Sequence, residues 1–470
     1  MSESKVLADP MPVAVLKEKS LKGAPLKGPK GHPILGVLPM LRDDTLNFLK
    51  QVSRDYGDLV PLRILMSTAY LLNHPAHVEH VLQKNHRNYK KSPMVGKLRP
   101  VMGDGLLISE GELWTRQRKL IQPSFLKERV DALGQRMVDV IDKHTKLWDE
   151  CAASGKPFNL SWDVSAITLE IAFQTMFDTG LGADAQGFKD AMAIAHDVTA
   201  ERVWNLTSLS EKFPTKRNRE YNEAIAYLQG ICTRIINERR ASTHRSDDLL
   251  SILMEARDAD TNEAMSEQQL RDEVMTLMVA GHDTTATMVG WAIYMLAQHP
   301  THLERMRDEV DALMAGRLPQ ASDMKGLDYT KRILQEVARL RPSIWWFARV
   351  AINDDNIAGQ PIKAGTTVFI SQYLIQTHPQ IWDDPEKFDP DRFLPENTAG
   401  RSKFAYFPFG AGPRVCIGSG FAMMEMAFVL AMIFRRYDVE ITSDEPVFGN
   451  LVTLRPHEHI WARAKPRLRH

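Results

Sequence analysis

The sequence predicts one large, mainly α-helical domain with a minor β portion, an α+β fold. Three observations support this fold class. Apolar residues recur at helical spacing, β-type runs are few and local, and no tandem repeat or long linker divides the chain. With 470 residues, 44% of them hydrophobic, the chain can bury a large core. Its 59 basic residues balance 59 acidic ones, so net charge gives no reason to expect a nucleic-acid partner.

The N-terminal residues 1–33 are rich in Lys, Pro and Gly, and we expect a flexible leader before a single domain over 34–470. No apolar signal core and no uninterrupted apolar span are recognisable, so neither export nor a membrane anchor is predicted, and a cytoplasmic monomer is expected. Three cysteines in so long a chain argue against a disulfide framework. We expect Cys232 to be buried on an apolar helix face and Cys151 to be an exposed thiol near a helix end.

Strand signals occur at 60–72, with a turn at Ser67-Thr68, at 361–371 and at 448–464. Helical spacing is clear over 221–236 and 330–340. The longest helix is expected to begin at a capping box of Ser266 and Gln269 and to stop before Pro300. Polar residues at 281–285 interrupt its apolar middle, which favours a buried core helix over a membrane span.

The segment 409–418, Phe-Gly-Ala-Gly-Pro-Arg-Val-Cys-Ile-Gly, puts Cys416 between a glycine-rich loop and an apolar helix. Unpaired N–H groups at the helix start, with Arg414 nearby, favour the thiolate. Glycines at 410, 412 and 418 would let a flat, bulky group approach, and Phe409 could shield the sulfur. These features favour a macrocycle ligand. An incidental cysteine on a glycine-rich turn is the alternative, and a nucleotide loop fits less well because the third glycine is missing.

This segment resembles the haem-binding signature of the cytochrome P450 family, and three further motifs follow in the family's order from about residue 30 to the end. The resemblance implies the cytochrome P450 fold, with a long central helix over a haem b (iron protoporphyrin IX) whose iron is bound by the axial thiolate of Cys416. Trp114 and Arg118 match residues that hold a haem propionate, and Arg349 and Arg414 match its further contacts. The implied cofactor-binding set is Trp114, Arg118, Ala280, Gly281, Arg349, Phe409, Arg414, Cys416 and Gly418.

Residues 280–285, Ala-Gly-His-Asp-Thr-Thr, match the family's oxygen-activation segment. Dioxygen activation needs protons in an otherwise dry site, and Asp283 beside Thr284 could relay them, while Gly281 would leave room for dioxygen. The alternative is a threonine bonded back to its own helix and a solvated aspartate. Glu336 and Arg339 lie one turn apart, and the resemblance makes them a buried ion pair completed by Arg392, a structural lock under the haem loop.

One departure from the family pattern occurs after Tyr373, where a His-Arg pair is common and this chain reads Gln376-Thr377-His378-Pro379. It makes contacts near the haem edge uncertain without touching the ligand chemistry.

The resemblance implies a monooxygenase that uses dioxygen to hydroxylate or epoxidise a lipophilic small molecule, such as a fatty acid, terpenoid or steroid. Electrons would come from a separate ferredoxin or flavodoxin with its NAD(P)H reductase, and Arg116, Lys119, Lys127 and Arg129 form a basic run that could steer it. A peroxide-driven peroxygenase and a non-catalytic haem sensor or carrier are the alternatives, the last with His282 as the candidate second ligand. The substrate pocket is expected to be lined by Leu98, Val101, Ile344, Trp345, Trp346, Leu451 and Val452.

Overall fold

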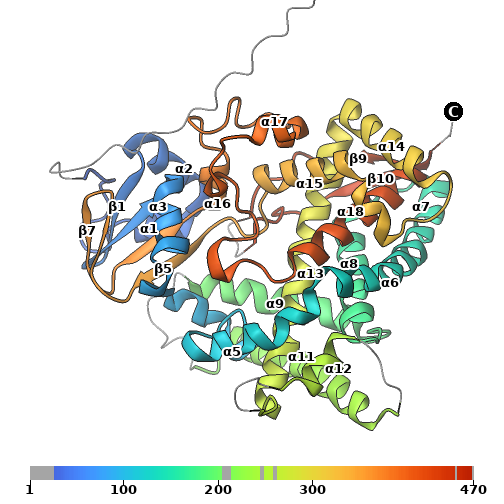
Figure 1. Ribbon diagram of the computed structural model, residues 1–470, viewed down its shortest axis with the longest axis horizontal. Helices are drawn as coiled ribbons and strands as arrows, with labels where there is room; N and C mark the ends of the chain where they lie inside the picture. The colour runs from blue at the N-terminus through green and yellow to red at the C-terminus, as the bar shows by residue number, and fades with distance from the viewer. Residues whose placement is uncertain (1–25, 204–212, 244–247, 258–261, 450–452, 468–470) are drawn as a thin grey trace, which may run out of the picture.

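The computed structural model describes residues 26–203, 213–243, 248–257, 262–449 and 453–467. Figure 1 shows helices filling one side of the molecule and the largest sheet lying on the other. The predicted class, mainly α with a minor β portion, is confirmed. The leader predicted at 1–33 lies largely outside the described residues.

Helices make up most of the described chain. Their bounds are α1 Leu38–Asp43, α2 Thr45–Tyr56, α3 Pro75–Glu79, α4 Arg99–Met102, α5 Gly111–Ile121, α6 Lys127–Lys146, α7 Trp148–Ser154, α8 Leu160–Met176, α9 Asp184–Val203, α11 Lys216–Ala241, α12 Leu249–Glu255, α13 Glu267–Gln298, α14 Pro300–Met314, α15 Asp328–Leu340, α16 Gln372–Gln376, α17 Pro395–Thr398 and α18 Ser419–Arg436.

The strands form three small sheets. The largest has the order β1-β2-β8-β5-β3, in which only β2 and β8 run parallel. A second sheet has the order β4-β10-β9, and β6 pairs with β7 alone. The bounds are β1 Leu59–Ile64, β2 Ser67–Leu72, β3 Tyr89–Lys91, β4 Phe158–Asn159, β5 Phe347–Ala351, β6 Asp355–Ile357, β7 Gln360–Ile362, β8 Thr367–Ile370, β9 Tyr437–Ile441 and β10 Trp461–Pro466.

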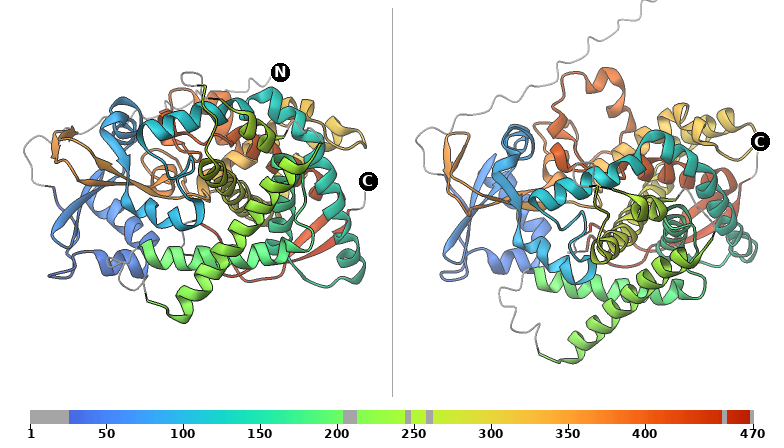
Figure 2. Two further views of the ribbon diagram at one scale, coloured as in Figure 1. Left: turned by 90° about the horizontal axis from the view of Figure 1, so that it is seen from below. Right: turned by 60° about the horizontal axis from the view of Figure 1, so that its bottom comes forward.

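The central helix α13 has 32 residues and begins at the predicted capping box, in which Ser266 and Gln269 cap each other's backbone N–H groups. It ends at Gln298, ahead of Pro300 as expected. Both views in Figure 2 show it enclosed by other helices, and most of its residues are buried. At the usual rise per residue it is about 48 Å long, so it can line a site in the middle of the domain.

Some local predictions are corrected. The β1–β2 turn falls at Leu65 and Met66, two residues before the predicted Ser67-Thr68, and Leu65 adopts a φ of 54° there. Cys151 is partly buried against the main core inside α7, so it is not the exposed thiol that we expected. Cys232 is buried as predicted, and burial raises the pKa of its thiol to about 12.

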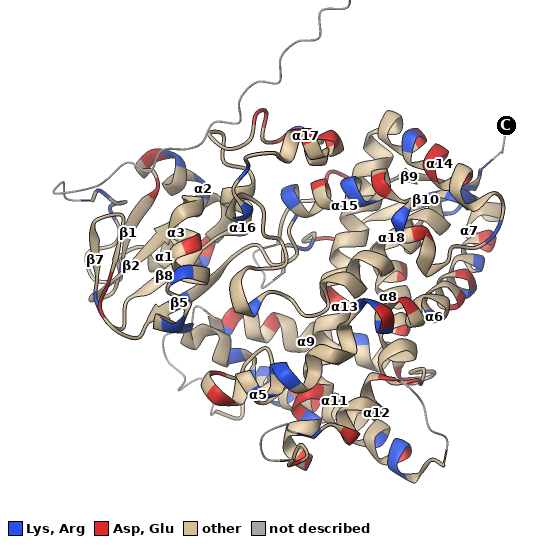
Figure 3. Cartoon of the chain, viewed as in Figure 1, with Lys and Arg blue, Asp and Glu red and all other residues tan. Residues whose placement is uncertain are grey.

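Among the described residues, no helix has both the length and the apolar character needed to cross a membrane. Acidic and basic residues are interspersed over the face seen in Figure 3, as the zero net charge suggests.

Candidate functional site

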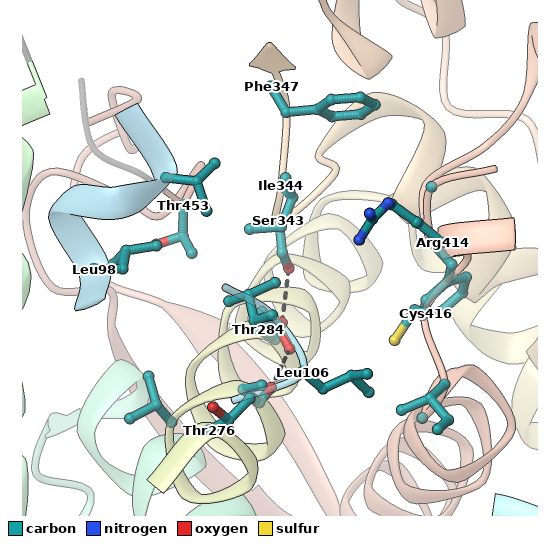
Figure 4. Close-up of a pocket in the computed structure, with 18 of the residues that line it drawn as sticks. Leu98, Leu106, Thr276, Thr284, Ser343, Ile344, Phe347, Arg414, Cys416 and Thr453 are labelled. Atoms are coloured by element: carbon teal, nitrogen blue, oxygen red, sulfur yellow. Dashed lines mark hydrogen bonds between the residues drawn. The ribbon is translucent and has the colours of Figure 1, made fainter. Parts of the chain in front are cut away.

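A cavity of about 500 Å³ lies between the middle of α13 and the loop that precedes α18, within the range of roughly 300 to 1,000 Å³ that is typical of ligand sites. Its lining is mostly apolar, and Figure 4 shows Cys416 pointing into it from one side, with Thr284 on the other. The accessible surface of Cys416 faces this cavity.

The cysteine loop is held by its own backbone. The Cys416 N–H donates to the carbonyl of Phe409 at 2.8 Å. Gly410 and Gly412 have φ angles of 74° and 70°, which favour glycine. A Cβ on Gly412 would lie 1.9 Å from the carbonyl oxygen of Leu82. That glycine is therefore required by a close approach of backbone to backbone, which is a different reason from the approaching cofactor that we predicted.

Opposing effects act on the pKa of the Cys416 thiol, and the net shift is upward. Burial raises its pKa, while the N–H of Gly418 at the start of α18 and the charge of Arg118 act to lower it. Arg414, the predicted source of positive charge, forms an ion pair with Glu110 instead. Since the net shift is upward, the thiolate depends on a bound metal ion, which deprotonates a coordinating thiol.

Basic side chains gather at one edge of the cavity. The Arg414 guanidinium stacks on Trp114 at 4.2 Å and pairs with Glu110, but its Nη1 is buried without a hydrogen-bond partner in the described part of the chain. Arg118 also lines the cavity and donates from Nη1 to the carbonyl of Val415 at 2.9 Å. A buried guanidinium nitrogen without a partner fits an anionic ligand group here.

Lys91 and Arg349 add two more positive charges to this edge, and both line the cavity. The Lys91 ammonium donates to the carbonyl of Ser109 at 2.8 Å. Burial, followed by repulsion from Arg414, lowers the pKa of Lys91 to about 7 and that of Arg349 to about 10. Such an excess of buried positive charge fits the two propionates of a haem, and Lys91 was not found from the sequence.

The central helix faces the cavity with Ala280, Gly281 and Thr284. The Thr284 hydroxyl donates to the carbonyl of Ala280 at 3.0 Å, which is the back-bonded geometry weighed as the alternative. Its oxygen still borders the cavity. A Cβ on Gly281 would lie 3.1 Å from Cε of Met176 on α8, and both residues line the cavity, so the space predicted for dioxygen beside this glycine stays a prediction.

Asp283 does not line the cavity. Its Oδ2 is buried without a hydrogen-bond partner in the described residues and lies 3.9 Å from Nε2 of His196. Burial acts to raise the pKa of Asp283, but electrostatic attraction by His196, His282 and Arg455 outweighs it, with help from the Thr453 hydroxyl, so the net shift is downward. The carboxylate is thus held ionised behind the cavity wall, one residue from Thr284.

His282 points away from the cavity. Its Nε2 lies 2.8 Å from the Ser165 hydroxyl on α8, and burial lowers its pKa to about 4. It therefore does not supply the second ligand that a haem sensor or carrier would need.

The family model described as Cytochrome P450 matches residues 26–461. This chain is a cytochrome P450. It is 32% identical to a protein named cyclooctatin synthase from Streptomyces melanosporofaciens, over 92% of this chain and 93% of that one. It is 33% identical to cyclooctat-9-en-7-ol 5-monooxygenase of the same organism, over 87% and 88% of the two chains. Pentalenene oxygenase from Streptomyces avermitilis is 29% identical, over 89% and 92%.

Membership settles the class of the enzyme. The P450 is an oxidoreductase, a haem monooxygenase that acts on lipophilic substrates, and its haem b carries an axial cysteine thiolate, from Cys416. The basic edge and the apolar walls described above fit that group.

The three residues of the structural lock come together beneath the cysteine loop. Arg339 and Glu336 form two parallel hydrogen bonds of 2.7 Å, and both side chains are fully buried. Arg392 Nε lies 3.5 Å from Glu336 Oε1, while its Nη2 donates to the carbonyl of Asp384 at 2.8 Å. Arg392 thus adds a second guanidinium group to the Glu336 carboxylate, as the resemblance implied.

The departure at 376–379 has a structural explanation. Gln376 is fully buried, and its Nε2 donates to the carbonyls of Ala338 and Arg339 at 2.9 and 3.2 Å. Its Oε1 accepts from the N–H of Phe407 at 2.9 Å. The glutamine therefore ties the end of α15 to the segment entering the cysteine loop. Sequence reasoning missed this role because all three partners are distant in the chain.

Four of the predicted pocket residues line the cavity: Leu98, Ile344, Trp345 and Trp346. Val101, on α4, does not line the cavity. It is buried in the main hydrophobic core and borders a separate hollow beside α11. Leu451 and Val452 lie outside the described residues. Phe409 and Gly418 line the cavity beside Cys416, as expected.

Proposed function

We propose that this P450 hydroxylates or epoxidises a lipophilic small molecule, such as a fatty acid, a terpenoid or a steroid. The observation that carries the proposal is the position of the Cys416 sulfur opposite Thr284 across an apolar cavity. The relatives named for pentalenene and for cyclooctat-9-en-7-ol support a terpenoid-like skeleton within this range.

Haem bound through Cys416 supplies the activation of dioxygen and the insertion of one oxygen atom into a C–H bond or a double bond. We assign the binding of its propionates to Arg118, Arg349 and Arg414, with Lys91 as an additional cation and Trp114 as a support for Arg414. The unpartnered Arg414 Nη1 supports this assignment, since a carboxylate would satisfy it. Apolar residues on the remaining walls exclude water from the reacting centre.

Proton delivery is assigned to Thr284 and Asp283. The Thr284 hydroxyl borders the cavity, and by turning away from the Ala280 carbonyl it would donate its own proton into the cavity and take up one from Asp283 in its place. Asp283 holds a carboxylate behind the wall, and its Oδ2 lies 3.9 Å from Nε2 of His196, so a proton can reach Oδ2 through that imidazole. A short side-chain rotation of Asp283 toward Thr284 would then complete the transfer.

The test is spectroscopic and chemical. The purified protein should bind haem and, when reduced under carbon monoxide, absorb as a thiolate-ligated haem does, whereas Cys416→Ala should lose that absorption. Lipophilic ligands should displace iron-bound water and shift the ferric spectrum. Product should form with a surrogate reductase and NAD(P)H, and not without them. Wild-type protein with a globin-like carbonyl spectrum would contradict the proposal.

We also propose that the electron donor is an acidic ferredoxin or flavodoxin that docks on the side of the cysteine loop. Phe125 lies against Gly418, so the α5–α6 connection borders the loop. Val415 and Leu126 are 37% and 53% exposed. Lys127 and Arg129 follow Leu126 at the start of α6, and Lys119 lies near the end of α5. An apolar centre with a basic rim is suited to an acidic partner.

Charge reversal tests this surface. Lys119→Glu with Arg129→Glu should slow reduction by the partner, with the largest effect at low salt, because steering is screened by ions. Lys363→Glu, on the turn after β7, is the matched control and should leave the rate unchanged. Lys127 is less informative because it already pairs with Asp131. An unchanged rate in the double variant would reject the surface.

A further inference from the structure

The face of α9 that lines the cavity carries a hydroxyl without a partner. Thr199 is 1% exposed and borders the cavity, yet its Oγ1 has no hydrogen bond within the described residues. A buried hydroxyl in this state costs free energy, so such groups are few in native proteins and call for an explanation.

Other threonines on the helices around this one satisfy their hydroxyls locally. Each donates to the carbonyl four residues earlier: Thr145 to Ile141 at 2.7 Å, Thr175 to Ile171 at 2.6 Å, Thr284 to Ala280 at 3.0 Å, Thr285 to Gly281 at 3.4 Å and Thr287 to Asp283 at 2.9 Å. Thr199 does not use the corresponding carbonyl of Ala195. Its hydroxyl is thus left available to a molecule in the cavity.

A second polar group lies beside it. His196 is one turn earlier on α9, borders the cavity and has Asp283 3.9 Å from its Nε2. Arg455 pairs with Asp197 at 3.3 Å, which brings the segment around Thr453 against the same helix. In Figure 4, Thr453 lies beyond Thr284 as seen from Cys416. The polar patch therefore lies on α9, beside Asp283 of the central helix.

Among the other hydroxyls of the described lining, that of Thr453, beside Asp283, is also buried without a hydrogen-bond partner, whereas the rest are bonded to the protein. Ser343 donates to the carbonyl of Thr284 at 2.7 Å, and Thr276 donates to that of Met102 at 3.4 Å. Gln372, on α16, also borders the cavity with an unpartnered Oε1. On α9, a hydroxyl and an imidazole lie one turn apart and can together both donate and accept.

We propose that Thr199 and His196 form an anchor for a hydroxyl group on an otherwise lipophilic substrate, so that this P450 oxidises an alcohol rather than a bare hydrocarbon. The proposal deepens the proposed function and rests on it. The substrate hydroxyl would donate to one group and accept from the other, which would fix the skeleton with a distant carbon toward the haem. A hydrocarbon of the same shape would leave the Thr199 hydroxyl unpaired and would bind more weakly.

The test uses the haem-loaded protein and matched rigid ligands: decalin with 2-decalol, adamantane with 1-adamantanol, and androstane with 3-androstanol. Dissociation constants are measured by the ferric absorbance shift and, independently, by calorimetry. For each pair, the ratio of hydrocarbon to alcohol dissociation constant is compared between variants, so that differences in ligand hydration cancel. Thr199→Val should lower this ratio by about three- to tenfold, the usual worth of one hydrogen bond.

Four further variants make the result specific. Thr199→Ser keeps the hydroxyl and should restore the ratio. Thr276→Val removes a lining hydroxyl that is already bonded and should leave the ratio unchanged. Gln372→Leu and Thr453→Val each remove another unpartnered polar atom of the described lining, and a fall in the ratio in either of these variants alone would overturn the placement on α9.

Stability gives a second readout. Because the Thr199 hydroxyl has no partner, Thr199→Val should leave the thermal midpoint of the ligand-free holoprotein unchanged or raise it. A lowered midpoint with an unchanged ratio would mean that the hydroxyl has a structural role, and the anchor would be refuted. Failure of the proposed function is distinguishable, since then neither member of any pair would shift the spectrum.

Discussion

Replacing Gln376 with Leu removes three buried hydrogen bonds between α15 and the segment that leads into the cysteine loop. The leucine fills a similar volume, so packing is largely retained. The carbonyls of Ala338 and Arg339 lie in the last turn of α15, where carbonyls lack helical partners, and they would be left unpaired together with the N–H of Phe407.

The expected cost follows from the number of stranded groups. At about 1 kcal/mol each, the lower end for a buried group that loses its partner, the three give about 3 kcal/mol. That is a large share of the free energy of unfolding of a typical protein, which is roughly 5 to 15 kcal/mol. The loss also reaches the metal ligand, because Gly410 N–H donates to the Phe407 carbonyl at 2.9 Å and Cys416 N–H to that of Phe409 at 2.8 Å.

Two measurements check this reasoning on the haem-loaded protein. Urea unfolding followed by circular dichroism should show a lower midpoint for Gln376→Leu, and a larger fraction of the reduced carbonyl form should absorb as haem without its thiolate. Thr377→Val is the matched control, since the half-buried Thr377 hydroxyl, directly after α16, donates only to the carbonyl of Tyr373 in that helix, at 2.7 Å. If both variants unfold at the same urea concentration and keep the thiolate spectrum equally, the proposed tie is wrong.

Three further predictions concern the loop, the proton relay and the basic edge. Gly412→Ala should abolish haem retention because the added Cβ would lie 1.9 Å from the carbonyl oxygen of Leu82. Gly400→Ala is the control, since Gly400 has a φ of 78° but open space around it. It should lower the free energy of unfolding by only about 1 to 2 kcal/mol in an unfolding titration. Asp283→Asn should retain haem but slow dioxygen-driven turnover about 100-fold, while peroxide-driven turnover persists; equal activity would reject the relay. Burial lowers the pKa of Lys91 to about 7 in the haem-free protein, and pairing with a propionate would raise it. Haem should therefore be held most tightly below pH 7 and lost faster as the pH rises. In a haem-transfer assay, Lys91→Met should make the rate of haem loss less dependent on pH. A wild-type rate that does not depend on pH would contradict the contact between Lys91 and a propionate.

The parts of the fold that the sequence predicts well are those with local signals. The capping box of Ser266 and Gln269 and the proline at 300 fix both ends of α13 within the sequence itself. The β1–β2 turn was misplaced because its tip is Leu65-Met66, an apolar pair with no turn signature, and the neighbouring Ser67-Thr68 resembled one. Strand β5 went unpredicted because its partners β3 and β8 come from distant parts of the chain, and pairing rather than composition makes it a strand.

The site divides in the same way. The cysteine loop and the Asp283-Thr284 pair are contiguous motifs, so their residues could be named from the sequence. Lys91 was not singled out from the sequence, and the role of Gln376 could not be assigned. A lysine in a short strand and a glutamine at the end of a short helix carry no local signal for such roles. Their roles come from partners far along the chain, at Ser109 and Phe407.

Buried polar atoms without partners fall into two groups, and only one group indicates a ligand. Both carboxylate oxygens of Glu425 are unpartnered, but this residue does not line the cavity, and burial raises its pKa well above the usual value, so it is held as a neutral acid in the core. The Arg414 guanidinium group cannot lose its proton in the protein, and the Thr199 hydroxyl is already neutral, so neither can avoid the cost of burial by changing its protonation state. Both border the cavity, at the basic edge and on α9. Each can therefore be satisfied only by something that enters the cavity: a carboxylate at one site and a hydroxyl at the other.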